Sequence, residues 1–139
     1  MATATKETVL IQALEAAVTG DGSRIDDTFT EDVVGWSPNL AVASRAELAA
    51  EFGERHDALS NIVIAFDATY IIGDNAIAEW RIEADHTGPL ELEDDVVIPP
   101  SGRRIVLAGA TFAEFRGDQI SAFRNYFDDA ALLEQLLDF

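Results

Sequence analysis

The spacing of the apolar residues changes near the middle of the chain, and this change restricts the fold more than any other feature. Up to residue 61 apolar side chains recur every three or four positions, which is typical of amphipathic helices. Beyond it they alternate or form short runs, which is typical of strands. The predicted strands cover residues 62–72, 76–86, 104–115 and 119–128. Helices followed by an antiparallel meander predict an α+β domain with helices on one face of a curved sheet.

Local signals divide the first half further. Ser and Thr cap helices by accepting a hydrogen bond from a first-turn N–H, and glycine often ends them. On these signals we expect a helix over 5–18 that stops at Gly20, a short helix from Ser23, a brief strand over 31–38 and a third helix from Ser44 to Asn61. A last short helix is expected to begin at Asp128 or Asp129.

Length and charge exclude several classes of protein. The 139 residues suit a single domain, 1–139, and the chain has no cysteine for a disulfide or thiolate metal site. The net charge of −17, with Lys6 as the one lysine, disfavours a nucleic-acid partner. Two interpretations of this charge are open: it serves ordinary solubility, or it indicates a host that lives at high salt. No stretch is long and apolar enough to span a membrane, so a cytoplasmic location is the default expectation.

The strand predicted over 104–115 has apolar residues at both alternating sets of positions, so both of its faces are expected to be buried. The helices of one chain can cover one face only. We therefore predict a homodimer that pairs sheet to sheet. The alternative is a monomer whose outer face is covered by the 87–103 loop and the C-terminal helix.

The last two strands predict a small apolar hollow. A two-residue turn at Gly117-Asp118 makes Arg116 oppose Gln119. Counting back pairs Phe112 with Phe123, Ala110 with Asn125, and Ala108 with Phe127. Phe123 and Phe127 then form walls around Asn125, which offers a donor and an acceptor. In the alternative reading, the alanines make room for helices and the backbone satisfies Asn125.

A charged pair lies on the strand over 76–86. Arg81 and Glu83 share one face of this strand, and Ala78, Trp80 and Ile82 lie on the other. The pair is either a solvated ion pair of little energetic worth or, if covered, an acid and its orienting group.

Four short motifs, in order, carry a family resemblance. They are Gly73-Asp74-Asn75 with Glu79-Trp80-Arg81, then Asp85-His86-Thr87-Gly88, then Pro99-Pro100-Ser101-Gly102-Arg103, and finally Asn125-Tyr126-Phe127-Asp128. Over essentially the whole chain their order and spacing resemble the SnoaL-like polyketide cyclase family. The resemblance implies the cone-shaped fold of nuclear transport factor 2, usually dimeric, with an apolar pocket between sheet and helices. Such folds host unrelated reactions, so it says less about chemistry.

For function, the resemblance implies a cofactor-free intramolecular aldol closure of an aromatic polyketide ester. An acidic side chain takes and returns the proton, and an apolar pocket raises a carboxyl pKa toward the range such a base needs. The candidates are Asp128, Glu83 and His86, with Arg81 and Asn125 orienting the substrate. Side chains expected to contact the substrate are Asn125, Trp36, Phe112, Phe123 and Phe127. A helix cap for Asp128 and a backbone hydrogen bond for His86 are the structural alternatives.

The chain also resembles the epoxide hydrolases of the same fold, whose arginine and aspartate match Arg81 and Glu83. Their second aspartate falls on Asn125, and their water-holding pair falls near Val34 and Trp36, so epoxide hydrolysis is disfavoured. A non-catalytic binder of an apolar ligand and a dimeric accessory protein remain as alternatives. Two histidines 30 residues apart, His56 and His86, predict no metal site. The acidic residues 91–95 are expected to form an exposed loop, and 87–102 a lid.

Overall fold

The computed structural model describes residues 5–38, 40–53, 58–91 and 96–137. Its helices are α1 (Lys6–Thr19), α2 (Ile25–Thr28), α3 (Arg45–Gly53) and α4 (Asp129–Leu137). Its strands are β1 (Phe29–Ser37), β2 (Leu40–Val42), β3 (Leu59–Ile72), β4 (Asn75–His86), β5 (Leu90–Glu91), β6 (Val97–Ile98), β7 (Arg104–Arg116) and β8 (Gln119–Phe127). The predicted α+β class is confirmed.

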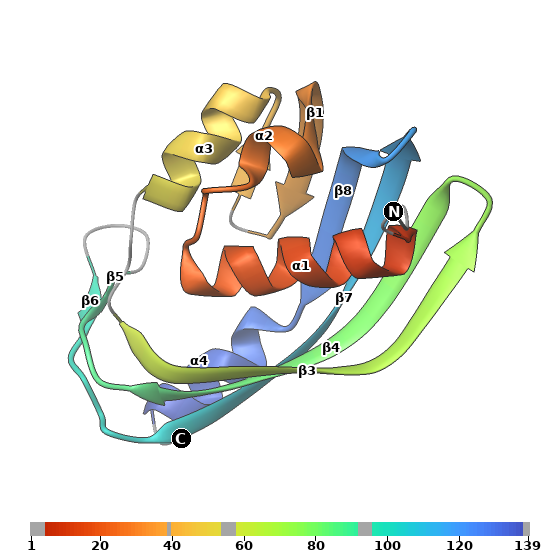
Figure 1. Ribbon diagram of the computed structural model, residues 1–139. Coiled ribbons are helices and arrows are strands. Elements are labelled where there is room, and N and C mark those ends of the chain that lie inside the picture. The colour runs from red at the N-terminus through yellow and green to blue at the C-terminus, as the bar shows by residue number, and fades with distance from the viewer. Residues whose placement is uncertain (1–4, 39, 54–57, 92–95, 138–139) are drawn as a thin grey trace.

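Six strands form one strongly curved sheet in the order β2-β1-β8-β7-β4-β3. All neighbours are antiparallel except β1 and β8, which run parallel, and β5 and β6 form a separate two-stranded ribbon. In Figure 1, α1 lies across the concave side of the sheet. Directly opposite residues of paired strands share a face, so the register assigns each side chain to the concave or the convex face.

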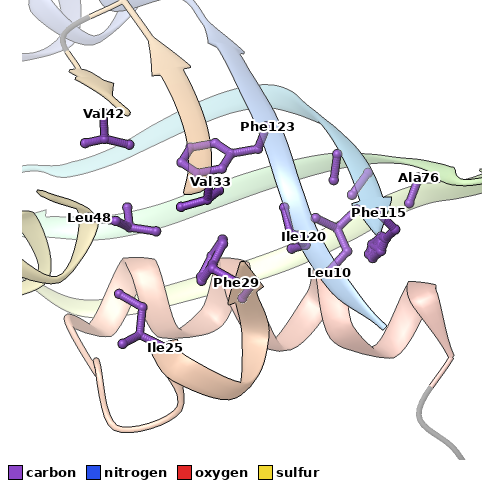
Figure 2. Packing of buried hydrophobic residues seen from close by; sticks show 13 residues of the cluster. Leu10, Ile25, Phe29, Val33, Val42, Leu48, Ala76, Phe115, Ile120 and Phe123 are labelled. Atoms are coloured by element: carbon purple, nitrogen blue, oxygen red, sulfur yellow. The ribbon is translucent and has the colours of Figure 1, made fainter. Parts of the chain in front are cut away.

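The larger core lies where α1, α2 and α3 meet the concave face. Figure 2 shows this cluster, in which Leu10 of α1, Ile25 of α2 and Leu48 of α3 point toward aromatic and aliphatic side chains of β1, β7 and β8. Phe29 and Phe123 are in contact, with ring centroids 5.9 Å apart. Their burial provides the main hydrophobic stabilisation of this half of the sheet.

A second, smaller core lies beneath α4. Leu132, Leu133 and Leu136 of this helix pack with Ala84 of β4 and Ile105 of β7. The neighbouring part of β7 extends beyond the end of β8. There the Gln135 side chain takes the place of a strand, because its amide accepts from the Val106 N–H and donates to the Val106 carbonyl, both at 2.8 Å.

Two predicted helix boundaries need correction. The third helix ends at Gly53, not at Asn61, and Leu59 to Asn61 belong to β3, where Leu59 pairs with His86. Pairing with a long neighbouring strand outweighed the helical spacing of Leu59 with the residues before it. The short second helix has Arg24, not Ser23, at its N-cap. The caps predicted at Ser44 and Asp128 are confirmed, since Ser44 Oγ and Asp128 Oδ1 accept from backbone N–H groups of their helices.

The predicted pairing of β7 with β8 was wrong by one residue. The turn begins as expected with Arg116 opposite Gln119, but an irregularity beside Glu114 and Phe115 adds one residue to β8. Beyond it, Thr111 faces Asn125 and Ala113 faces Phe123, whereas Phe112 faces Arg124. Because a shift by one residue exchanges the faces of a strand, Phe112 lies on the convex face, away from Asn125.

Candidate functional site

The concave face is covered unevenly, and its middle is only partly covered. The residues between the two cores are Ile64, Trp80, Ile82, Leu107, Asn125 and Phe127, here called the concave midsection. All except Trp80 are only half-buried, although they face the same side as the buried alanines of β4. A half-covered apolar surface with one polar side chain is suited to a small apolar ligand.

Trp80 forms the floor of the midsection. Its ring lies against Gly109 of β7, where an added Cβ would come within 2.5 Å of Trp80 Cη2. It also contacts the Phe127 ring, with centroids 6.3 Å apart at 51°. Glycine at position 109 therefore lets the indole lie flat on the sheet, and Trp80 is only 4% exposed.

A short chain of hydrogen bonds joins this floor to Asn125. The indole Nε1 of Trp80 donates to Thr111 Oγ1 at 2.9 Å, and Thr111 Oγ1 donates to Asn125 Oδ1 at 2.7 Å. Trp80 and Thr111 are both buried. The sequence analysis found Asn125 but missed its partner Thr111, and with it the bond from Trp80 to Thr111, because the bulge in β8 decides which residue of β7 faces Asn125.

His86 is fully buried at the far end of β4, near the second core. Its Nδ1 accepts from the Ser101 backbone N–H at 3.1 Å and lies 2.9 Å from Ser101 Oγ. The proton of the neutral ring is therefore on Nε2, and this atom has no partner among the described residues. Asn125 is level with Ala78, eight residues from His86 along β4 and hence about 26 Å along the strand. The two side chains do not act on the same atom of a small ligand.

Asp128 lies at the rim of the midsection, directly after Phe127. Its side chain is exposed, and its Oδ1 accepts from the Ala131 N–H at 3.1 Å, so it caps α4. Glu83 also follows a midsection residue, Ile82, but its side chain lies on the convex face.

Arg81 and Glu83 are exposed on the convex face, opposite the midsection. Arg81 lies 3.6 Å from Asp67, with both side chains about half exposed. Asp85 shares this face, and the hydrogen bonds from Asn61 and Arg104 hold its pKa below the usual value. Arg81 and Glu83 are therefore both exposed to solvent, and the ion pair that Arg81 forms is with Asp67.

The predicted contact residues divide between the two faces. Phe123 and Phe127 join Asn125 on the concave face, but Phe123 is buried in the larger core. Phe112 and Trp36 lie on the convex face, where Phe112 lies beneath the Arg124 guanidinium and Trp36 contacts the Tyr126 ring, with ring centroids 5.4 Å apart. One site cannot include all five side chains.

Two hollows lie away from the midsection. One, of about 260 Å³, lies between α1 and α2 beside Phe52, and a wider one, of about 970 Å³, is lined by Asp32, Arg45 and Arg116. Within 5–38, 40–53, 58–91 and 96–137, no group of histidine and acidic side chains is arranged to hold a metal ion. No helix in these same ranges has the length and apolar character needed to cross a membrane. His56 and residues 92–95 of the predicted lid and acidic loop lie outside the described residues.

Comparison with protein families gives the decisive result. The family model of the SnoaL-like domain matches residues 10–123, which is most of the chain. The chain belongs to the SnoaL-like family. Its N-terminal helices, curved mixed sheet and C-terminal helix form the nuclear transport factor 2-like fold that the sequence motifs implied.

Solved structures agree with this SnoaL-like fold. A candidate SnoaL-like polyketide cyclase from Jannaschia sp. CCS1 is 19% identical, with a TM-score of 0.74 and coverage of 98% of this chain and 96% of the other. IdmH, a candidate polyketide cyclase from Streptomyces antibioticus, is 15% identical, with a TM-score of 0.77 and coverage of 96% and 99%.

A third similar structure is named for a different activity. An LEH-like epoxide hydrolase from M. tuberculosis is 14% identical, with a TM-score of 0.68 and coverage of 94% and 87%. No curated protein matches the chain. At these identities the likeness shows the fold alone, because the same SnoaL-like scaffold carries different reactions.

Proposed function

We propose that this SnoaL-like chain binds a flat, apolar small molecule on the concave midsection and closes a ring in it by a cofactor-free aldol reaction. The observation that supports this most is the half-buried state of the midsection between two well-packed cores. Ile82, Leu107 and Phe127 supply apolar contacts there, and Asn125 is the single polar side chain. An aromatic polyketide ester has matching chemistry, and related folds named as candidate polyketide cyclases support the reaction class.

In this proposal Asp128 is the acid and base. Its carboxylate takes a proton from the carbon beside the ester carbonyl, the resulting carbanion attacks a ketone carbon of the same molecule, and the alkoxide that forms takes the proton back. Asp128 is preferred over Glu83 because Glu83 lies on the opposite face of the sheet. His86 is too far along β4 from Asn125 to share this role.

A matched pair of isosteric substitutions tests the assignment. Asn caps helices as well as Asp does, so Asp128→Asn keeps α4 capped and removes only the base. With a polyketide-like anthraquinone methyl ester as substrate, we expect Asp128→Asn to lower turnover at least about a hundredfold with little change in affinity. Glu83→Gln is the control and leaves turnover unchanged. Equal turnover by Asp128→Asn and the unmodified protein contradicts the catalytic role of Asp128.

A non-catalytic binder is the second candidate, and one observation favours it. Asp128 is exposed and already hydrogen-bonded to the Ala131 N–H, as expected for a cap. If the chain is a binder, flat aromatic ligands raise its melting temperature, but no product forms from any of them. Ligand-dependent stabilisation without product, in chromatography of long incubations, selects this alternative. No stabilisation by any flat aromatic compound contradicts both candidates.

We also propose a homodimer that pairs the convex faces of two sheets. Large apolar side chains lie exposed there, with Trp36 43% and Tyr126 49% exposed in the single chain. Val106 and the smaller Ala108 extend the apolar surface along β7. Equilibrium sedimentation at micromolar concentration should give twice the chain mass of 15.1 kDa, and Val106→Glu should return it to that value. A 15.1 kDa species for the unmodified chain excludes this dimer.

A further inference from the structure

We infer that the ligand of the midsection carries a carbonyl oxygen, and that Asn125 recognises it with an N–H group whose direction Thr111 fixes. This inference rests on the proposed function, since it concerns the same surface. It adds that the Asn125 amide N–H binds a carbonyl of this ligand, and it adds a positioning role for Thr111.

The polarity of the hydrogen-bond chain follows from its first member. The indole N–H of Trp80 can only donate, so Thr111 Oγ1 accepts from it. The one hydroxyl proton of Thr111 is then free for Asn125, whose acceptor is Oδ1. The amide of Asn125 is therefore fixed with Oδ1 toward Thr111 and Nδ2 away from it.

Burial holds this arrangement in place. Trp80 is 4% and Thr111 2% exposed, so reversing the Asn125 amide would leave the Thr111 hydroxyl proton buried without an acceptor. Asn125 itself is half-buried. Its Nδ2 has no hydrogen-bond partner within the described ranges, and it is not among the buried unpaired atoms. The amide thus presents a positioned donor to whatever occupies the midsection.

The surroundings restrict the acceptor to a neutral one. None of the six midsection residues is charged, so no cation is present there to pair with a carboxylate or a phosphate. The chain carries a net charge of −17, which disfavours an anionic ligand further. A ketone or ester carbonyl on an apolar ring satisfies the N–H donor without a charge.

Two ligands of the same shape test the inference. 9-Fluorenone and fluorene differ in having a C=O or a CH₂ at one position. We expect the unmodified protein to bind fluorenone about 3- to 10-fold more tightly than fluorene, in titrations followed by tryptophan fluorescence, because only the ketone accepts the Asn125 hydrogen bond. Taking the ratio of the two dissociation constants for one protein removes effects on stability or on the fraction folded.

Substitutions then show which residues cause the preference for fluorenone over fluorene. The carboxylate that Asn125→Asp introduces can still accept from Thr111 but no longer donates, so the ratio should fall to about 1 or below. Thr111→Val removes the hydroxyl at similar volume and should lower the ratio, and Thr111→Ser should restore it. Asn75→Asp, on the convex face, adds the same charge and should leave the ratio as it was.

The outcomes separate this inference from the proposed function. Equal affinity of the unmodified protein for both ligands, or a ratio unchanged in Asn125→Asp, overturns the carbonyl assignment while leaving ligand binding intact. A Thr111→Val ratio equal to that of the unmodified protein overturns the positioning role of Thr111. If the unmodified protein binds neither compound, the proposed function fails as well, and the inference fails with it.

Discussion

The two faces of the central sheet are built from the same strands but carry opposite chemistry. On β4, the concave positions are Ala76, Ala78, Trp80 and their successors, and none of the six midsection residues is charged. The convex positions of the same strand include Glu79, Arg81 and Glu83, which are exposed. Alternation along a strand places charges and neutral groups within one residue of each other in sequence yet on opposite sides of the molecule.

This contrast decides which candidate residues can act together. A catalytic carboxylate and its substrate contacts must share a face, so Glu83 is separated from Asn125 whatever the intrinsic chemistry of each residue. The convex face also carries exposed aromatic side chains, a residue type enriched in protein–protein interfaces, and the proposed dimer uses these side chains. The neutral concave face suits a small apolar molecule instead.

The two tryptophans provide the largest test of the comparison. Trp80 is 4% exposed on the concave face and Trp36 is 43% exposed on the convex face. Trp80→Ala should lower the free energy of unfolding by about 3–5 kcal/mol, as expected for a large buried side chain. Trp36→Ala should lower the free energy of unfolding by less than about 1 kcal/mol, measured by urea titration at low protein concentration. If the proposed dimer forms, the cost of Trp36→Ala increases with protein concentration. Equal costs at low concentration contradict the contrast between the faces.

Alanine substitutions at two glycines are expected to differ by the next largest amount in stability. A Cβ at Gly35 of β1 would overlap the ring of Phe123 on the concave side, whereas one at Gly22 would lie at ordinary distance, 3.7 Å, from Phe52. Gly35→Ala should lower the free energy of unfolding by about 1–3 kcal/mol, because the core is overpacked. Gly22→Ala is the control and should be nearly neutral. A neutral Gly35→Ala would mean that Phe123 is free to move, and that this part of the concave face is loosely packed.

The cap at Asp128 is expected to contribute about 1 kcal/mol. Asp128→Ala should lower the stability by that amount, since the Ala131 N–H loses its acceptor, and Asp128→Asn should retain it. Thermal unfolding of the two variants measures the difference. A loss of the same size in both variants would show that charge, not the hydrogen bond, is what Asp128 contributes to α4.

The smallest expected effect is the dependence of protein stability on pH that Asp85, on the convex face, produces. Hydrogen bonds from Asn61 and Arg104 lower the pKa of Asp85 in the folded chain. A lowered pKa stabilises the fold at pH values above the ordinary pKa of an aspartate, about 3.9, and this stabilisation is lost as the pH falls through the folded value. Asp85→Asn should therefore be less stable than the unmodified protein near neutral pH and should approach it in acid. Urea unfolding across that range measures this, and a difference independent of pH contradicts the assignment.

Much of the architecture could be predicted from local patterns. The spacing of Val9, Leu10, Ala13 and Leu14 indicated α1, and alternation indicated β3, β4, β7 and β8, because helix and strand periods follow directly from backbone geometry. The end of α3 was missed, since Leu59 fits a helical stripe locally but pairs with His86 in the sheet. Asn125 could be found as a polar residue among aromatic ones, but its partners could not.

The sequence by itself determined the fold class, the family and the chemistry available on each strand, because these depend on residue identity and spacing. The tertiary structure alone decided which residues meet. One extra residue in β8 moved Phe112 to the convex face and brought Thr111 to Asn125. No local pattern encodes such a bulge, since its effect is a shift of register between strands that changes every pairing beyond it.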